Sequence, residues 1–421
     1  MASQPGRVVI FFWEGYLGIA PSLINGVREL ARAGLEVDVV TRRLSTPYAR
    51  IPDFPPGVRV LTDRPAAPSG AAVQRETALG TLLARSASRV RRRAPEWLKR
   101  LLRRPRAYLE LLGALPRFLA LAVRATRRRD YRCFIGVDPL GLVTATALAA
   151  RRRVPVYYWS LELAVVGDSP DPIRRGLKRL ERSCHRRAAL TISQDEERAR
   201  TLVLENRVRP PKLALVPNAP CGPAPRLESD FLQRKFGLPP RRRVLLQIGM
   251  LGPDALSLEL AREASRWGED WTLVLHASSR FDEADPYVQR IRRAGNGRTL
   301  LSLEPLRYDD LDALVASAHV GLAFYRPALG PHFVSARASG KLGQYLRCGL
   351  PVVCSDFPGL ADTVGRYRCG VGVTSVAEVT RAVREVLEHY AAYRANAIRC
   401  YEEAYEFGAR FRQVVSEIER A

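Results

Sequence analysis

Residues 339–341, Ser-Gly-Lys, place a small-residue turn and a cation at the predicted start of a helix. A helix that begins at Gly340 leaves its first backbone N–H groups without partners, and the positive end of its dipole points the same way. Lys341 adds a formal charge at that position. The arrangement suits a phosphate or diphosphate. The alternative is an ordinary capped helix with a solvated lysine, and these three residues alone do not decide between the two.

The loop that follows the first predicted strand carries two glycines, Gly15 and Gly18. In an open parallel sheet, ligands bind where strands end and helices begin, and glycines let the backbone approach a ligand closely. A tight turn with no ligand explains the same glycines. The loop does not fit the dinucleotide pattern G-x-G-x-x-G, and Thr41-Arg42-Arg43 stands where that pattern needs an acid. This argues against a nicotinamide or flavin enzyme.

Three further side chains follow predicted strands. Glu162 and Asp138 are the candidate catalytic carboxylates, because each follows a buried strand and should lie at the interdomain cleft. A carboxylate there can orient an acceptor or stabilise positive charge on a sugar ring. A solvated helix-start glutamate and a turn-forming Asp-Pro are the alternatives. His276 closes a strand of the second half, where a buried structural histidine is the alternative to a ligand contact.

Alternating strands and helices must position these residues. Apolar runs predict strands at 7–13, 37–41, 133–137, 154–159, 189–193 and 212–216, and then at 244–248, 271–276, 299–303, 320–325 and 351–355. Residues 217–227 hold four prolines and read as a linker. Two such runs predict an α/β protein with two facing, doubly wound, Rossmann-like domains. The domains are expected at 1–218 and 219–392, with a C-terminal amphipathic helix at 393–421.

Composition limits the class of protein. The chain has 421 residues, 47% hydrophobic and 26% charged, which fits a globular protein of two or three domains. No apolar run reaches the length of a membrane span, and no signal-peptide cleavage site is evident, so we expect a cytoplasmic protein. The seven cysteines have no zinc-finger spacing, which predicts reduced thiols and no metal site.

The net charge of +24 is concentrated in residues 85–132, which hold sixteen Lys or Arg against three acids. Trp97 and Leu101 belong to one apolar stripe of this segment, and Leu115 and Leu119 to another. An apolar stripe flanked by arginines is typical of a helix that lies on anionic lipid. A domain helix packed on the sheet is the alternative. Nucleic acid is disfavoured, because no aromatic and basic strand platform or helix-turn-helix spacing is present.

The block from Ser339 to Val352 resembles the signature S-G-K-L-x-x-Y-L-x-x-G-x-P-V of family-4 GT-B glycosyltransferases. The chain is similar to that family elsewhere, at Val216-Pro217-Asn218, Ile248-Gly249 and the segment from Leu303 to Asp310. The resemblance implies two facing Rossmann-like domains, a nucleotide-sugar donor held by the second and an acceptor held by the first. It also implies retention of anomeric configuration, no metal and no cofactor beyond the donor. The donor-binding residues it indicates are Gly15, Gly18, Gly249, His276, Arg280, Leu306, Tyr325, Arg337, Ser339, Gly340, Lys341 and Gln344.

The chain departs from the family pattern at the E-x7-E pair, whose positions are occupied by Ala336 and Gln344. The first glutamate of that pair contacts the transferred sugar, and the second contacts the ribose. Gln344 keeps hydrogen-bonding capacity without charge, whereas Ala336 keeps neither. The basic pair expected after Gly249 is also missing, so Lys341, Arg337 or Arg280 would have to supply its charge.

The sequence therefore predicts a metal-independent glycosyltransferase, peripheral on the inner face of the cell membrane. Its expected partners are a nucleotide-sugar donor, a saccharide or lipid-linked acceptor of cell-envelope polysaccharide or glycolipid synthesis, and an anionic membrane surface, with no nucleic acid. Two alternatives stay open: a non-catalytic GT-B binding or scaffold protein, and a nucleotide-sugar epimerase.

Overall fold

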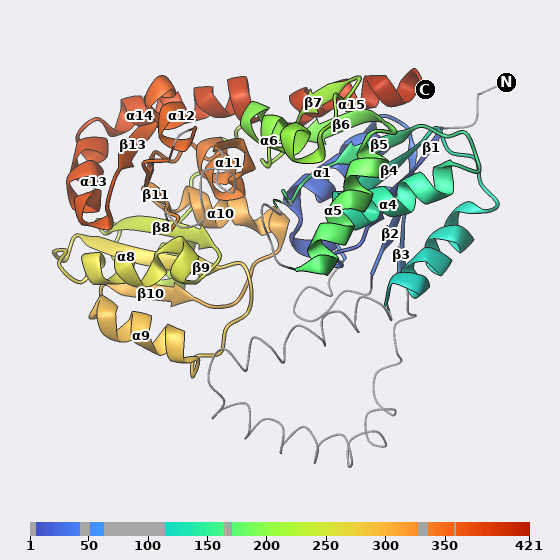
Figure 1. Ribbon diagram of the computed structural model, residues 1–421. Coiled ribbons are helices and arrows are strands. Elements are labelled where there is room, and N and C mark those ends of the chain that lie inside the picture. The colour runs from blue at the N-terminus through green and yellow to red at the C-terminus, as the bar shows by residue number, and fades with distance from the viewer. Residues whose placement is uncertain are drawn as a thin grey trace, which may run out of the picture.

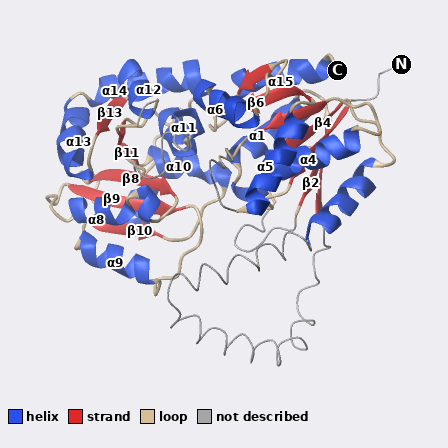
Figure 2. Ribbon diagram, viewed as in Figure 1, coloured by secondary structure: helices blue, strands red, loops and turns tan. Residues whose placement is uncertain are grey.

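The computed structural model describes residues 6–42, 51–62, 114–163, 165, 171–326, 336–357 and 359–421. Two parallel sheets form two halves that lie side by side, each with helices on both faces (Figures 1 and 2). The first sheet has seven strands in the order β3-β2-β1-β4-β5-β6-β7, and the second has six in the order β10-β9-β8-β11-β12-β13. The prediction of two doubly wound α/β units is confirmed.

The strands of the first sheet are β1 (Arg7–Phe12), β2 (Glu36–Thr41), β3 (Val58–Thr62), β4 (Cys133–Val137), β5 (Val156–Trp159), β6 (Ala188–Ser193) and β7 (Leu213–Leu215). Its helices are α1 (Pro21–Arg32), a helix at 114–126, α4 (Asp138–Ala149), α5 (Pro172–His185) and α6 (Glu196–Asn206). The prediction from sequence missed β3.

The strands of the second sheet are β8 (Arg243–Gly249), β9 (Trp271–Ala277), β10 (Thr299–Ser302), β11 (Val320–Ala323), β12 (Val352–Ser355) and β13 (Gly370–Val373). Its helices are α7 (Phe231–Phe236), α8 (Ser257–Ala264), α9 (Pro286–Gly295), α10 (Leu311–Ala316), α11 (Gly340–Arg347), α12 (Leu360–Tyr367), α13 (Val379–Glu388) and α14 (Tyr390–Cys400).

Strand β1 shows why continuous apolar runs form these sheets. Successive side chains of a strand point to opposite faces. Val8, Ile10 and Phe12 therefore enter the core under α1, whereas Val9 and Phe11 enter the core under α4 and the helix at 114–126. Because helices cover both faces, every position of the strand must be apolar.

The predicted C-terminal amphipathic helix is divided in two. A π-helical turn at Tyr401–Tyr405 separates α14 from α15 (Phe407–Glu419). Helix α14 packs on the second half, and α15 returns to the first half and packs against α1 and β7. Phe411 of α15 is fully buried and lies 5.5 Å from Trp159, measured between ring centroids.

The basic segment predicted to contact lipid is described only in part, because residues 85–113 lie outside the described residues. In the described part, Phe118 and Ala122 are fully buried and Leu115 packs on the same core. The interpretation of Leu115 as lipid-facing is therefore wrong: the helix at 114–126 needs its apolar side to cover the sheet. Over the described residues, no helix is both long and apolar enough to span a membrane.

Candidate functional site

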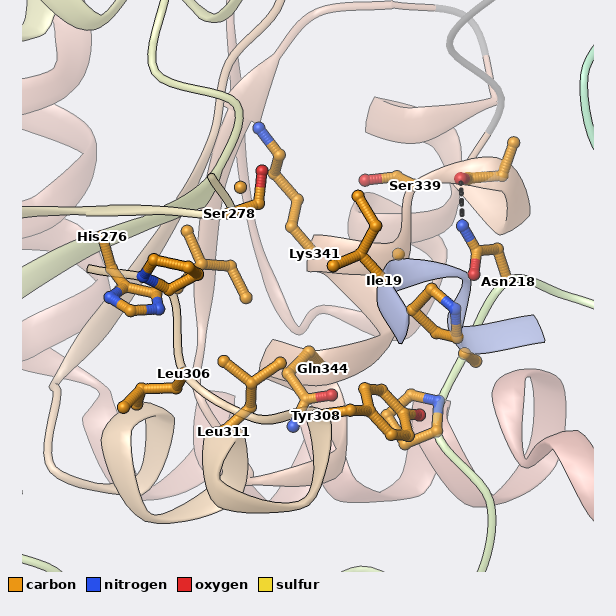
Figure 3. Close-up of a pocket in the computed structure, with 18 of the residues that line it drawn as sticks. Ile19, Asn218, His276, Ser278, Leu306, Tyr308, Leu311, Ser339, Lys341 and Gln344 are labelled. Carbon is orange, nitrogen blue, oxygen red and sulfur yellow. Dashed lines mark hydrogen bonds between the residues drawn. The ribbon is translucent and has the colours of Figure 1, made fainter. Parts of the chain in front are cut away.

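A cavity of about 290 Å³ lies between the two halves (Figure 3). The carboxyl edge of the second sheet, the linker after β7 and the loop after β1 all contribute to its wall. The residues that line it are Gly18, Ile19, Pro21, Asn218, Ala219, Pro220, Ile248, Gly249, His276, Ser278, Pro305, Leu306, Tyr308, Leu311, Tyr325, Ala338, Ser339, Gly340, Lys341 and Gln344.

Helix α11 begins at this cavity. Ser339 is its N-cap and accepts a hydrogen bond from Leu342 N through Oγ, at 3.4 Å. The same Oγ lies 2.6 Å from the hydroxyl oxygen of Tyr325. A Cβ on Gly340 would lie 3.1 Å from Nδ2 of Asn218, so the absence of a side chain lets the linker pack against the helix start. The turn is thus built around its small residues.

The Lys341 side chain crosses the same end of the cavity. Its Nζ lies 4.5 Å from the centroid of the Tyr325 ring, and burial lowers the pKa of its ammonium to about 8. Gly249, at the end of β8, has a φ of +106°, which favours glycine. A Cβ there would lie 3.7 Å from Lys341 Cε. A strand end, a helix start and a half-buried cation therefore meet at one point, which is what a diphosphate requires.

A second group of side chains forms another part of the wall. His276 lies beside Leu306 in the view of Figure 3, and both line the cavity. His276 Nδ1 is 2.9 Å from Ser302 Oγ, and burial lowers the pKa of the imidazole to about 4. The ring is therefore neutral at physiological pH and can take part in hydrogen bonds without charge. Leu306 supplies an apolar wall.

Gln344 and Tyr308 separate this cavity from a second one of about 250 Å³, since both residues line both cavities. Gln344 Nε2 donates to Asp312 Oδ1 at 2.5 Å, so its amide oxygen is the group left for a ligand. Tyr308 Oη accepts a hydrogen bond from Asn25 Nδ2 of α1 at 2.9 Å. Arg28 of α1 also pairs with Asp309 at 2.8 Å, which joins the two halves here.

Three carboxylates follow β1, β4 and β5, which are adjacent strands of the first sheet. Asp138 is buried, and its Oδ1 accepts the backbone N–H groups of Leu161 and Glu162, each at 2.8 Å. Burial raises its pKa well above the ordinary value, with Glu162 and Glu14 adding to the effect. Its Oδ2 is buried and has no hydrogen-bond partner.

Glu14 and Glu162 are exposed to solvent, unlike Asp138. Partial desolvation raises the pKa of each carboxyl. Arg42 opposes the rise at Glu14 and Glu162 adds to it, whereas Arg198 opposes the rise at Glu162. Neither of these side chains, nor Asp138, lines the cavity between the two halves, so the structure places the two predicted catalytic carboxylates outside its wall.

The structure brings most of the predicted donor residues together but leaves three out of the cavity wall. Arg280 pairs with Glu304 at 2.9 Å, and both side chains are exposed. Arg337 points toward Glu196, at 3.4 Å. Gly15, in the loop after β1, has a φ of +72° and does not line the cavity. Among the described residues, no group of three or more His, Cys, Asp or Glu is placed to hold a metal ion.

Several residues were absent from the predicted site, among them Asn218 and Tyr308, which line the cavity, and Glu14, which interacts electrostatically with Glu162. Asn218 and Tyr308 are held by hydrogen bonds to Ser22 and Asn25 of the first half. Asn218 and Tyr308 lie in segments that resemble the family, and Glu14 directly follows a buried strand, but spacing alone did not assign any of them to the site.

No protein-family model matches the chain, and no curated protein matches it significantly in sequence. Solved structures do match over nearly the whole length. A sucrose-phosphate synthase from Thermosynechococcus elongatus is 15% identical, with a TM-score of 0.68 over 99% of this chain and 98% of that one. HepE from Anabaena, in complex with UDP and glucose, is 16% identical, with a TM-score of 0.66 over 99% and 100%.

A glycosyltransferase from Rickettsia africae is 8% identical, with a TM-score of 0.62 over 99% of this chain and 98% of that one. At these identities the likeness concerns the fold. Together with the seven- and six-stranded parallel sheets, it shows that this chain has the two-domain GT-B fold.

Proposed function

We propose that the chain is a glycosyltransferase that moves a sugar from a nucleotide-diphosphate donor to an acceptor. The observation that carries the proposal is the meeting of the α11 start, Lys341 and the Gly249 strand end at the interdomain cavity. Free N–H groups and an ammonium stabilise negative charge on a departing diphosphate. HepE, which has the same fold, was crystallised with UDP and glucose, and this supports a nucleotide-sugar donor.

The acceptor side lies at the carboxyl edge of the first sheet. Glu162 and Glu14 would accept hydrogen bonds from acceptor hydroxyls, and Asp138 holds the 161–162 backbone that carries Glu162. We propose a saccharide or lipid-linked saccharide at the inner membrane surface as acceptor, attacking on the face that the diphosphate leaves, with retention of configuration. The described residues supply Lys341 and backbone N–H groups at the diphosphate, so we propose that donor binding needs no divalent ion.

A non-catalytic binding protein is the second candidate, because Ala336 and Gln344 stand at the positions of the two family glutamates. It would bind the nucleotide without turning over the donor.

One experiment separates these functions. The protein is incubated with UDP-, GDP- and ADP-sugars, with and without an inner-membrane lipid extract, and chromatography follows both nucleoside diphosphate release and conversion of the sugar nucleotide. The transferase releases diphosphate only when an acceptor is present, and the metal proposal is checked in the same assay with EDTA. An epimerase converts the donor without acceptor, and a binding protein does neither. Failure of every nucleoside diphosphate to bind in calorimetry would contradict the donor site itself.

A further inference from the structure

The bend that follows β5 is held by buried side chains on both sides of its backbone. Asp138 Oδ1, at the start of α4, accepts the N–H groups of Leu161 and Glu162, each at 2.8 Å. On the other side, Gln194 Nε2 and Arg198 Nη2 both donate to the Leu161 carbonyl oxygen, at 2.7 and 2.8 Å. Asp138, Gln194 and Arg198 are 3%, 3% and 4% exposed. Two neighbouring peptide groups are therefore fixed by three side chains from elsewhere in the first half.

The Asp138 backbone is strained. Its φ is +57°, which is uncommon for a residue with a side chain, and a proline follows it, which disfavours helical conformations. The packing of α4 is tight on either side of this residue. A Cβ on Gly136 would lie 2.4 Å from Leu142 Cα, and a Cβ on Gly141 would lie 2.3 Å from a carbonyl oxygen of β1. Strain of this kind persists where the surroundings over-determine a residue, and it is concentrated at functional sites.

The two oxygens of the Asp138 carboxyl have different surroundings. Oδ1 accepts two N–H groups, whereas Oδ2 is buried and has no hydrogen-bond partner among the described residues. The titratable groups near this carboxyl are Glu14 and Tyr16 after β1, Tyr158 on β5, Glu162 in the bend and Arg198 on α6. Burial raises the pKa of Asp138 well above its ordinary value, although the two N–H groups oppose the rise.

A proton on Oδ2 resolves this arrangement. A buried carboxylate with an unpaired oxygen has a large desolvation cost, and protonation removes the ionic part of that cost. The neutral carboxyl keeps Oδ1 as an acceptor for both N–H groups. The exposed Glu162 can then stay ionised, because the neighbouring carboxyl carries no charge to repel it.

We propose that Asp138 is a positioning residue that, as a neutral acid, joins Gln194 and Arg198 in fixing residues 161–162 and so holds the Glu162 carboxylate at the acceptor side. Because Asp138 is almost completely buried, it acts through Glu162 and not on the substrate. The inference rests on the proposed function for the role of Glu162. It deepens that function by giving the two predicted catalytic carboxylates different tasks, a contact with the acceptor and a support for that contact.

The first test is a double-mutant cycle on turnover, with the inner-membrane lipid extract as the source of acceptor. Asp138→Ala removes the acceptor of both N–H groups, so it should lower turnover about 10²-fold and leave nucleoside diphosphate affinity unchanged. Adding Glu162→Gln should then cause little further loss, because both changes act on the same carboxylate. Asp138→Asn keeps an acceptor oxygen and should retain about tenfold more turnover than Asp138→Ala.

The matched control for this cycle is Asp38→Asn. Asp38 is a carboxylate of β2 that is 1% exposed and paired with Arg59, so its replacement also disturbs a buried polar contact of the first half. Any loss of turnover in Asp38→Asn should add to the loss in Glu162→Gln. A purely structural role for Asp138 predicts the same additivity for Asp138→Ala.

The second test reads the proton on Asp138 through stability. The unfolded chain releases this proton at about pH 4, whereas the folded protein keeps it to higher pH. The free energy of unfolding therefore falls as the pH rises through that interval. Asp138→Asn cannot titrate and lacks this fall, so the urea midpoint of wild type should decline relative to that of Asp138→Asn between about pH 4 and pH 7.

Amide hydrogen exchange gives a readout that needs no turnover. The N–H groups of Leu161 and Glu162 should exchange slowly in wild type and in Asp138→Asn, and about 100-fold faster in Asp138→Ala. Unchanged exchange in Asp138→Ala would overturn the inference. Additive losses in the cycle would do the same, as would a difference in urea midpoint that is constant with pH or grows in the opposite direction. A wild type without turnover would contradict the proposed function, and the urea and exchange measurements would still decide whether Asp138 is neutral and fixes the bend.

Discussion

The ammonium of Lys341 lies over the ring of Tyr325, 4.5 Å from its centroid, at the start of α11. The ring holds the cation in a partly apolar setting, and the Tyr325 hydroxyl is itself fixed by Ser339 at 2.6 Å. A cation–π contact of this kind stabilises an ammonium group, but less well than full hydration does. This agrees with the lowered pKa of Lys341.

Nucleoside diphosphate affinity should therefore depend on pH through Lys341. Its pKa is about 8 in the free protein, and an anion binds the protonated form more tightly. Affinity should be constant below that pH and should fall as the pH rises above it. Calorimetry between neutral and alkaline pH measures this slope. Lys341→Ala should reduce the binding free energy of the nucleoside diphosphate by about 1 to 3 kcal/mol at neutral pH. The same change should remove the dependence of affinity on pH. Lys341→Arg should keep the charge and give a flat profile, and a slope that survives in Lys341→Ala would assign the titration to another group.

Replacing Gln344 with glutamate, the residue of the family pattern, should lower the free energy of unfolding. Gln344 is buried and donates to Asp312, whose other oxygen pairs with Arg347 at 2.6 Å. A carboxylate at 344 would face the Asp312 carboxylate and lose that hydrogen bond, at about 1 to 3 kcal/mol of unfolding free energy. Urea denaturation of Gln344→Glu measures the loss. Combining it with Asp312→Asn should recover most of it, and equal stability of Gln344→Glu and wild type would show that the two side chains do not interact.

Glu162→Gln should reduce turnover by about 10²- to 10⁴-fold if the carboxylate assists the acceptor hydroxyl. The donor cavity does not include Glu162, so diphosphate affinity should not change. Because partial burial raises the pKa of Glu162, wild-type turnover should fall as acidic pH protonates this carboxyl, starting at a higher pH than for an exposed glutamate. Glu269→Gln, at a carboxylate with an 81% exposed side chain, is the matched control. Loss of diphosphate binding in Glu162→Gln would indicate a structural role instead.

Phe411→Ala should destabilise the first half although it lies near the C-terminus. The ring is fully buried and lies against Trp159 and Phe407. Its loss should lower the free energy of unfolding by about 3 to 5 kcal/mol. Val415→Ala, on the partly buried side of α15, should cost much less. Urea denaturation followed by tryptophan fluorescence compares the two. Equal effects would mean that α15 contributes little to this core.

Local sequence predicted most of the fold because the sheets are buried on both faces. The run at 7–13 corresponds to β1 at Arg7–Phe12, and Gly340 begins α11 as expected. Strands β3 and β13 were missed because both lie at the edge of a sheet and are only partly buried, so they form no continuous apolar run. Buried central strands carry the strongest pattern, and edge strands carry the weakest.

The site was predictable where one segment supplies it and not where several segments meet. Ser339, Gly340 and Lys341 are consecutive, so their role at a phosphate site can be predicted from the sequence alone. Tyr308 lines the cavity, and its hydroxyl accepts a hydrogen bond from Asn25 of the other half, a contact that no local pattern predicts. Arg280 was assigned to the donor by its charge alone, and its pairing with Glu304 could not be read from spacing.

The return of α15 to the first half links folding to the order of synthesis. Phe407, Phe411, Val414 and Ile418 complete the core beneath α1, although nearly all of the second half separates them from it in sequence. While the chain emerges from the ribosome, the first sheet is left with an uncovered apolar face until residues 407–419 are made. Such distant contacts also slow folding. The first half should therefore need chaperone protection during translation for longer than its own length would require.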